Sequence, residues 1–168
     1  YTEEALAHMV TRVSQIQDYL GRAILVENVS SYLQYESSTI PEWEFVAALA
    51  ERAGCGLLLD VNNIYVNACN HDFDASTYVR AIPAGLVQEI HLAGFTVNTV
   101  ADRSILIDTH SRPVCDDVWS LYRQTVQHLG AAVPTLIEWD SDLPPLDVLV
   151  GEARHADALL DECHGLPA

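Results

Sequence analysis

Five short apolar runs, each ending in a side chain that can bind a metal ion, constrain this chain more than any other feature. The runs occupy residues 24–27, 57–60, 87–91, 105–108 and 135–138 and end in Glu27, Asp60, His91, Asp108 and Glu138. A carboxylate or imidazole buried without a partner costs several kcal/mol. Five such groups at the same end of five buried strands therefore predict one shared partner, and a cluster of metal ions would supply it.

Segments with the apolar spacing of helices separate these runs, so strand and helix alternate along the chain. The runs begin near residues 24, 56, 87, 105 and 135, which is the βα repeat of a parallel sheet. A doubly wound sheet needs polar residues from only a few strand ends, whereas in a (β/α)8 barrel (TIM barrel) many strand ends converge on one mouth. All five runs end in a candidate ligand, and no phosphate-binding glycine motif follows any of them, so the pattern favours the barrel.

Five strands do not close a barrel. The sequence therefore predicts that residues 1–168 form a single domain, the C-terminal part of a barrel whose first three βα units are missing. Such a sheet has open edges, which predict an oligomeric or aggregation-prone chain.

Seven side chains form the predicted metal centre. In addition to the five that end the runs, Asn63 lies three residues after Asp60, and His110 lies two residues after Asp108, on the same side of a strand. Oxygen and nitrogen ligands without thiolate suit iron, manganese or zinc. Seven ligands are too many for one ion, so two or three ions sharing carboxylates are expected.

The charge and the composition of the chain limit the kinds of binding partner and the cellular compartment that we expect. The net charge of −16 argues against a nucleic acid and agrees with a cation site or a neutral or basic peptide. The cysteines Cys55, Cys69, Cys115 and Cys163 form no CxxC pair and indicate reduced thiols of a cytoplasmic protein. No stretch reaches the ~18 apolar residues of a membrane helix, so no membrane partner is expected.

The order of these ligands resembles that of the endonuclease IV and xylose isomerase-like barrel superfamily, in which endonuclease IV has histidine where Asn63 stands. Longer phrases resemble a narrower family, the multinuclear non-heme iron oxidases that include the methanobactin-biosynthesis enzyme MbnB and its relative TglH. The phrases are Glu27-Asn28-Val29-Ser30-Ser31-Tyr32, the stretch from Leu59 to Asn67, His91-Leu92-Ala93-Gly94 and Asp108-Thr109-His110-Ser111.

The resemblance implies a barrel that holds two or three irons and uses dioxygen to modify cysteine residues of a ribosomally made precursor peptide. It also implies a small partner protein that presents the peptide. Carried over, the metal ligands are Glu27, Asp60, Asn63, His91, Asp108, His110 and Glu138. The loops at 30–41 and 64–73 follow the first two strands, and we expect Asn28, Tyr32 and Tyr65 to contact the substrate.

Two other functions stay open from the sequence. A zinc- or manganese-dependent hydrolase or sugar isomerase could use the same barrel, although a DNA phosphodiesterase should carry a basic rim. A non-catalytic fragment, whose activity needs the missing half, is the other alternative.

Overall fold

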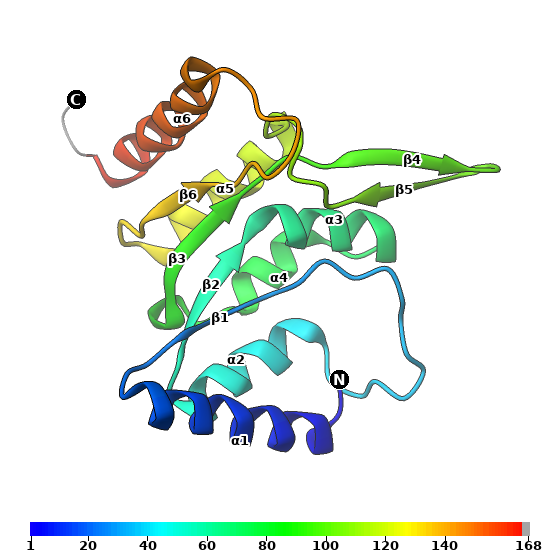
Figure 1. The fold of residues 1–168 in the computed structure, drawn as a ribbon, viewed down its shortest axis with the longest axis vertical. Coiled ribbons are helices and arrows are strands. Elements are labelled where there is room, and N and C mark those ends of the chain that lie inside the picture. Colours follow the sequence, from blue (N-terminus) through cyan, green and yellow to red (C-terminus); the bar gives the residue numbers. More distant parts are fainter. Residues whose placement is uncertain (166–168) are drawn as a thin grey trace.

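Four strands form one parallel sheet in the computed structural model, which describes residues 1–165, with the backbone alone at residue 100. The order across the sheet is β1 (Leu25–Glu27), β2 (Gly56–Asp60), β3 (Val87–Leu92) and β6 (Thr135–Ile137). Figure 1 shows that all four arrows point the same way, so their carboxyl ends meet at one edge of the sheet.

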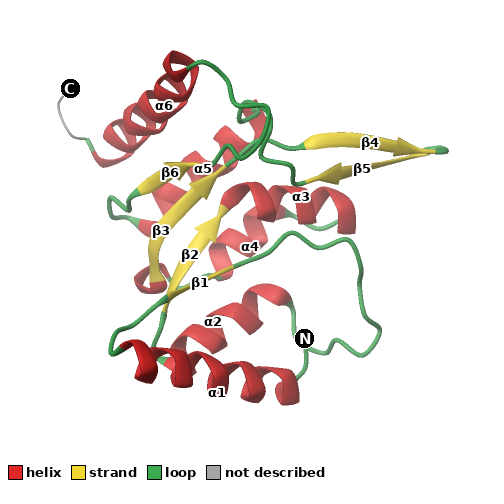
Figure 2. Cartoon of the chain, in the orientation of Figure 1, coloured by secondary structure: helices red, strands yellow, loops and turns green. Residues whose placement is uncertain are grey.

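Helices connect the strands and cover the sheet (Figure 2). They are α1 (Glu3–Leu20), α2 (Glu42–Ala53), α3 (Val61–His71), α4 (Ala75–Ala81), α5 (Asp116–Leu129) and α6 (Leu146–His164), with a 3-10 turn at Ala84–Leu86. The first helix begins where the Thr2 hydroxyl accepts a hydrogen bond from the Ala5 amide, and it ends at Gly21 in the left-handed conformation. Among the described residues, no helix combines the length and apolar character needed to cross a membrane.

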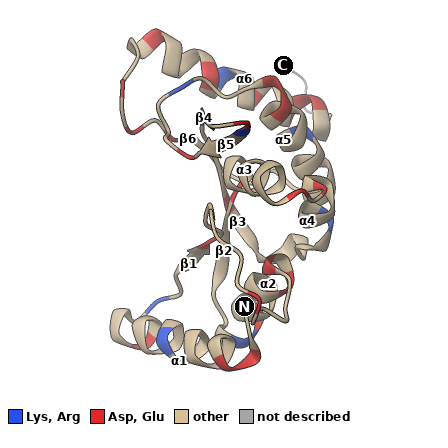
Figure 3. Cartoon of the chain, turned by 90° about the vertical axis from the view of Figure 1, so that its right-hand side faces the viewer, with Lys and Arg blue, Asp and Glu red and all other residues tan. Residues whose placement is uncertain are grey.

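The two faces of the parallel sheet carry different side chains. Leu57, Leu59, Ile90 and Leu92 are buried in the apolar core, which also includes residues of α2, α4 and α5. Figure 3 shows these three helices lying along one side of the strands. Because side chains alternate along a strand, the intervening residues project from the opposite face. That face carries the polar strand residues described below.

The run at 105–108 is not a strand of the parallel sheet, and the prediction that it is one was wrong. Residues Arg103–Ile107 form β5, which pairs antiparallel with β4 (Thr96–Val100) in a separate hairpin. Only Ala101 and Asp102 separate the two strands, and parallel strands need a crossover of about a dozen residues or more. A barrel built on this sheet would thus need four further strands, not three.

The segment at 64–73 is also different from the predicted loop. Residues Val61–His71 form α3, which begins directly after β2. Asp60 caps this helix, because its Oδ1 atom accepts a hydrogen bond of 2.6 Å from the Asn63 amide. The loop at 30–41, by contrast, has no helix or strand, as expected.

Candidate metal centre

The strand register brings the predicted ligands to one face and one end of the sheet. Asp60 lies opposite His91, and His91 lies opposite Leu136 on the next strand. Residues paired in this way project from the same face. Glu27 ends β1 on this face, and Glu138 follows β6 two residues after Leu136. The carboxyl ends of the strands thus place four of the predicted ligands together.

The first group of ligands consists of Glu27, Asp60, His91 and Glu138. One ligand atom from each lies within 4.8 Å of the others. His91 Nδ1 is 3.1 Å from Glu138 Oε2 and 3.6 Å from Glu27 Oε1. Three carboxylates around one imidazole repel one another unless a cation or proton separates them. This group has the donor types that bind a divalent ion.

The second group consists of His110, Glu138 and Asp140, whose ligand atoms also lie within 4.8 Å of one another. His110 Nδ1 is 3.4 Å from Glu138 Oε2 and 3.2 Å from Asp140 Oδ2. His110 has a positive φ of 47°, a strained conformation for a histidine. Glu138 belongs to both groups, and its Oε2 atom contacts both His91 and His110.

Buried oxygen atoms that lack a hydrogen-bond donor indicate whether these residues fit a metal ion. Asp60 Oδ2 and Asn63 Oδ1 are buried, and neither has a hydrogen-bond partner in the described part of the chain. The side-chain nitrogen Nδ2 of Asn63 donates a hydrogen bond of 3.1 Å to the backbone carbonyl of Asn28. This bond fixes which end of the Asn63 side-chain amide is the acceptor oxygen Oδ1. Buried acceptors without donors are costly, and a cation is a partner that would satisfy such an oxygen atom. The residues therefore fit a metal ion.

Burial and neighbouring charges shift several pKa values in the centre. Burial raises the pKa of Asp60 to about 8 and also raises the pKa of Glu27 above its usual value. The contact with Asp108 raises the pKa of His110 to about 9. Desolvation is the largest cause of the raised pKa values of Asp60 and Glu27, because burial disfavours the charged form of a carboxyl group.

Asp108 contacts the second group from outside it. Its Oδ1 atom lies 2.7 Å from His110 Nε2 and accepts a 2.7 Å hydrogen bond from the Asn62 side chain. Asp108 is not in either group of close ligand atoms, so its assignment as a ligand stays a prediction. In the structure its carboxylate contacts the His110 ring.

Sequence reasoning missed Asp140, which joins the second group. The signal was present, because Asp140 lies two residues after Glu138, as His110 does after Asp108. Asp140 was missed because it follows the apolar run instead of ending it. Glu89 was also missed; its Oε1 atom is 3.6 Å from His91 Nε2.

Comparison with known sequences identifies the family. A family model described as the RiPP precursor modification enzyme MbnB/TglH/ChrH, where RiPP denotes a ribosomally made and modified peptide, matches residues 1–161. The chain belongs to this family. The resemblance drawn from the sequence phrases is thus confirmed.

Curated relatives of this MbnB/TglH/ChrH chain come from diverse bacteria. A UPF0276 protein of Vibrio vulnificus is 56% identical over 160 residues, which are 95% of this chain and 55% of the relative. UPF0276 proteins of Acaryochloris marina and Chromobacterium violaceum are 51% and 46% identical, each over 95% of this chain and 56% of the relative. The chain thus spans about half the length of the curated relatives it matches.

The three predicted substrate contacts have other partners in the structure. Asn28 is buried and exchanges two hydrogen bonds of 2.9 Å with the backbone of Asp60. The Tyr32 hydroxyl accepts a hydrogen bond from the Asp108 amide at 3.0 Å, and Tyr65 lies on α3 and donates to Asp117 at 2.8 Å. Tyr32 and Tyr65 keep part of their rings accessible. Substrate contact by these residues stays a prediction, but Asn28 has a clear structural role.

Replacing Asn28 with alanine is expected to destabilise the fold by about 1–3 kcal/mol, because it leaves the buried N–H of Asp60 unpaired and removes one donor to its C=O. The free energy of unfolding in urea measures this. Asn98→Ala, on an exposed strand, is the matched control and should change stability by less than about 0.5 kcal/mol. Equal stability of the two variants would show that the hydrogen bonds of Asn28 to the Asp60 backbone do not stabilise the fold.

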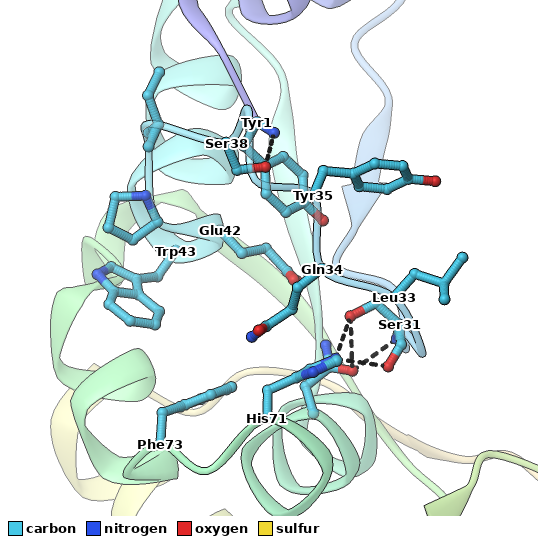
Figure 4. Close-up of a pocket in the computed structure, with 13 residues that line it drawn as sticks. Tyr1, Ser31, Leu33, Gln34, Tyr35, Ser38, Glu42, Trp43, His71 and Phe73 are labelled. Carbon is cyan, nitrogen blue, oxygen red and sulfur yellow. Dashed lines mark hydrogen bonds between the residues drawn. The ribbon is translucent and has the colours of Figure 1, made fainter.

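A separate cavity of about 600 Å³ lies beside the loop that carries Tyr35 (Figure 4). Gln34, Glu42, His71 and Phe73 line it together with residues of the same loop. Burial raises the pKa of Glu42, whose carboxylate accepts a 3.0 Å hydrogen bond from Tyr78. None of the predicted metal ligands lines this cavity, so it is distinct from the candidate centre.

Proposed function

We propose that this chain is the ligand-rich part of a multinuclear iron-dependent oxidase that modifies cysteine residues of a ribosomally made precursor peptide with dioxygen. The carboxylate of Glu138, shared between two groups of ligand atoms, carries the proposal. A shared carboxylate supports more than one ion, and the family acts on precursor peptides. The oxygen and nitrogen donors suit iron, although zinc and manganese accept similar ligands.

We infer that the whole protein is a (β/α)8 barrel. A four-stranded parallel sheet is half of such a barrel, and the chain spans about half of its relatives. The face that bears the ligands still exposes Leu136, which is 44% accessible. A closed barrel would cover this side chain with its other strands and add further ligands to the centre.

In this proposal each residue has a defined role. Glu27, Asp60, His91 and Glu138 would hold one ion, with Asn63 beside it, and His110, Glu138 and Asp140 would hold a second. Asn28 fixes the backbone of Asp60, and Asp108 orients His110. When bound, iron would supply the redox chemistry with dioxygen for the thiol group of the substrate cysteine.

A protein partner, a cytoplasmic location and an oligomeric state are further proposals. The family description supports a peptide substrate. The small presenting protein follows from the resemblance alone. The open edges of the sheet are the reason to expect association of this chain, and the whole barrel would remove them.

Elemental analysis of the anaerobically purified full-length protein tests the proposed function. We expect more than one iron per chain, together with oxygen uptake and a mass change in a cysteine-containing peptide. Zinc alone, with hydrolysis and no oxygen uptake, would assign the centre to the hydrolase class instead. A full-length protein that binds no metal would support the non-catalytic alternative.

A further inference from the structure

The hairpin of β4 and β5 projects away from the rest of the chain (Figures 1 and 2). It begins two residues after Gly94, which follows β3, and it ends one residue before Asp108, which contacts His110 of the candidate metal centre. Val97, Asn98 and Thr99 are exposed along β4. Because the hairpin is continuous in sequence with residues of the candidate metal centre, its exposed surface is well placed to bind the substrate.

On the outer edge of β5, a side chain forms the backbone hydrogen bonds that a neighbouring strand would form with one residue. The amide of Asn70, on α3, donates to the Leu106 carbonyl and accepts from the Leu106 N–H, both at 2.9 Å. Leu106 thus directs its backbone groups away from β4. Its partner across the hairpin is Val97, so this pair is a non-hydrogen-bonded pair of the antiparallel ladder.

The same alternation determines the edge of β4. Val97 and Thr99 lie opposite Leu106 and Ser104, so their N–H and C=O groups point away from β5. No other strand within residues 1–165 pairs with this edge. Unpaired backbone groups on an exposed edge accept another extended chain, which is the usual mode of strand addition.

We propose that the edge of β4 binds an extended segment of the precursor peptide and thereby leads its cysteine to the metal centre. This inference rests on the proposed function, because it takes the substrate to be a peptide. Glu89 lies beside the first group of ligands, Asp140 belongs to the second, and the chain carries a net charge of −16. The charges favour a segment with basic residues near its cysteine.

A second copy of this chain fits the edge less well. Pairing two β4 edges would join two chains that each carry a net charge of −16, and like charges disfavour that arrangement. The peptide has no such restriction.

Matched proline variants at one level of the hairpin test the proposal. Thr99 and Ser104 face each other with hydroxyl groups 3.4 Å apart, so replacing either one removes the same contact. Both residues direct their N–H groups outward, where proline is tolerated at a sheet edge. Thr99→Pro removes a donor from the β4 edge, and Ser104→Pro removes one from the opposite edge.

The probe is a fluorescent peptide of alternating lysine and valine with one central cysteine, about ten residues long to match a strand. Binding is measured by anisotropy on the metal-free protein. We expect Thr99→Pro to weaken binding about five- to ten-fold and Ser104→Pro to leave it within about two-fold. A peptide methylated on alternate backbone nitrogens should bind the unaltered protein at least about five-fold more weakly.

Other results would overturn the inference. Equal binding by both variants, or an equal loss in both with unchanged circular dichroism, would exclude the β4 edge as the site. A dimer that Thr99→Pro dissociates would show that a second copy occupies it. Because binding is measured without metal, any of these results would leave the test of the iron content and oxidase activity untouched.

Discussion

Glu138→Ala in the full-length protein should empty both groups of ligands and abolish oxygen uptake with a cysteine-containing peptide. The reason is that Glu138 supplies a ligand atom to both groups. Its loss leaves His91 and His110 each without their shared carboxylate. Because each lost ligand weakens metal binding, we expect iron per protein to fall at least about ten-fold.

Variants of residues that belong to only one group distinguish a bridging role of Glu138 from a general loss of structure. Glu27→Ala affects the first group alone and Asp140→Ala the second alone, so each should retain the other ion. Glu44→Ala, an exposed carboxylate on α2, should retain full iron and activity. Full iron in Glu138→Ala, or losses no greater than in Glu27→Ala, would contradict a bridging role.

Gly94→Ala is expected to destabilise the protein by about 3 kcal/mol or more and to weaken metal binding at His110. A Cβ atom at Gly94 would lie 2.0 Å from the Arg112 carbonyl oxygen and 2.6 Å from that of Pro113. These are backbone atoms, so the segment after His110 must move. Thermal unfolding and iron analysis measure the two effects.

Gly85→Ala is the matched control for this variant. An added Cβ at Gly85, in the 3-10 turn before β3, meets nothing within 4 Å. Its stability should change by less than about 1 kcal/mol. Similar stability of the Gly94 and Gly85 variants would show that the fold does not depend on the close approach of Gly94 to the backbone of Arg112 and Pro113.

The apolar runs show both the strength and the weakness of sequence reasoning here. Four of them form the parallel sheet in the expected direction. The run at 105–108 looks the same in sequence, but it lies in a hairpin. Periodicity alone cannot separate a short buried strand of a parallel sheet from a strand of a hairpin. The short turn at Ala101 and Asp102 was the missed signal.

The helix α3 was missed for a related reason. Its sequence contains Asn62, Asn63, Asn67 and Asn70, and asparagine favours turns over helix interiors. Tertiary contacts overcome this preference. Asn67 bonds to Ser31 and Val29, and Asn70 closes the edge of β5. Those partners lie more than thirty residues away in the chain, beyond the reach of local patterns.

By itself the sequence determined the family, the alternation of strands and helices, and the residue types that end the strands. These features are local: apolar runs form strands, and a polar residue at a strand end is visible in one dimension. Only the tertiary structure decided that Glu138 is shared by two groups, that Asp140 joins the second, and that Asp108 contacts His110 from outside it. The physical reason is that strand register and loop path set the distances between side chains, and neither can be read from spacing along the chain.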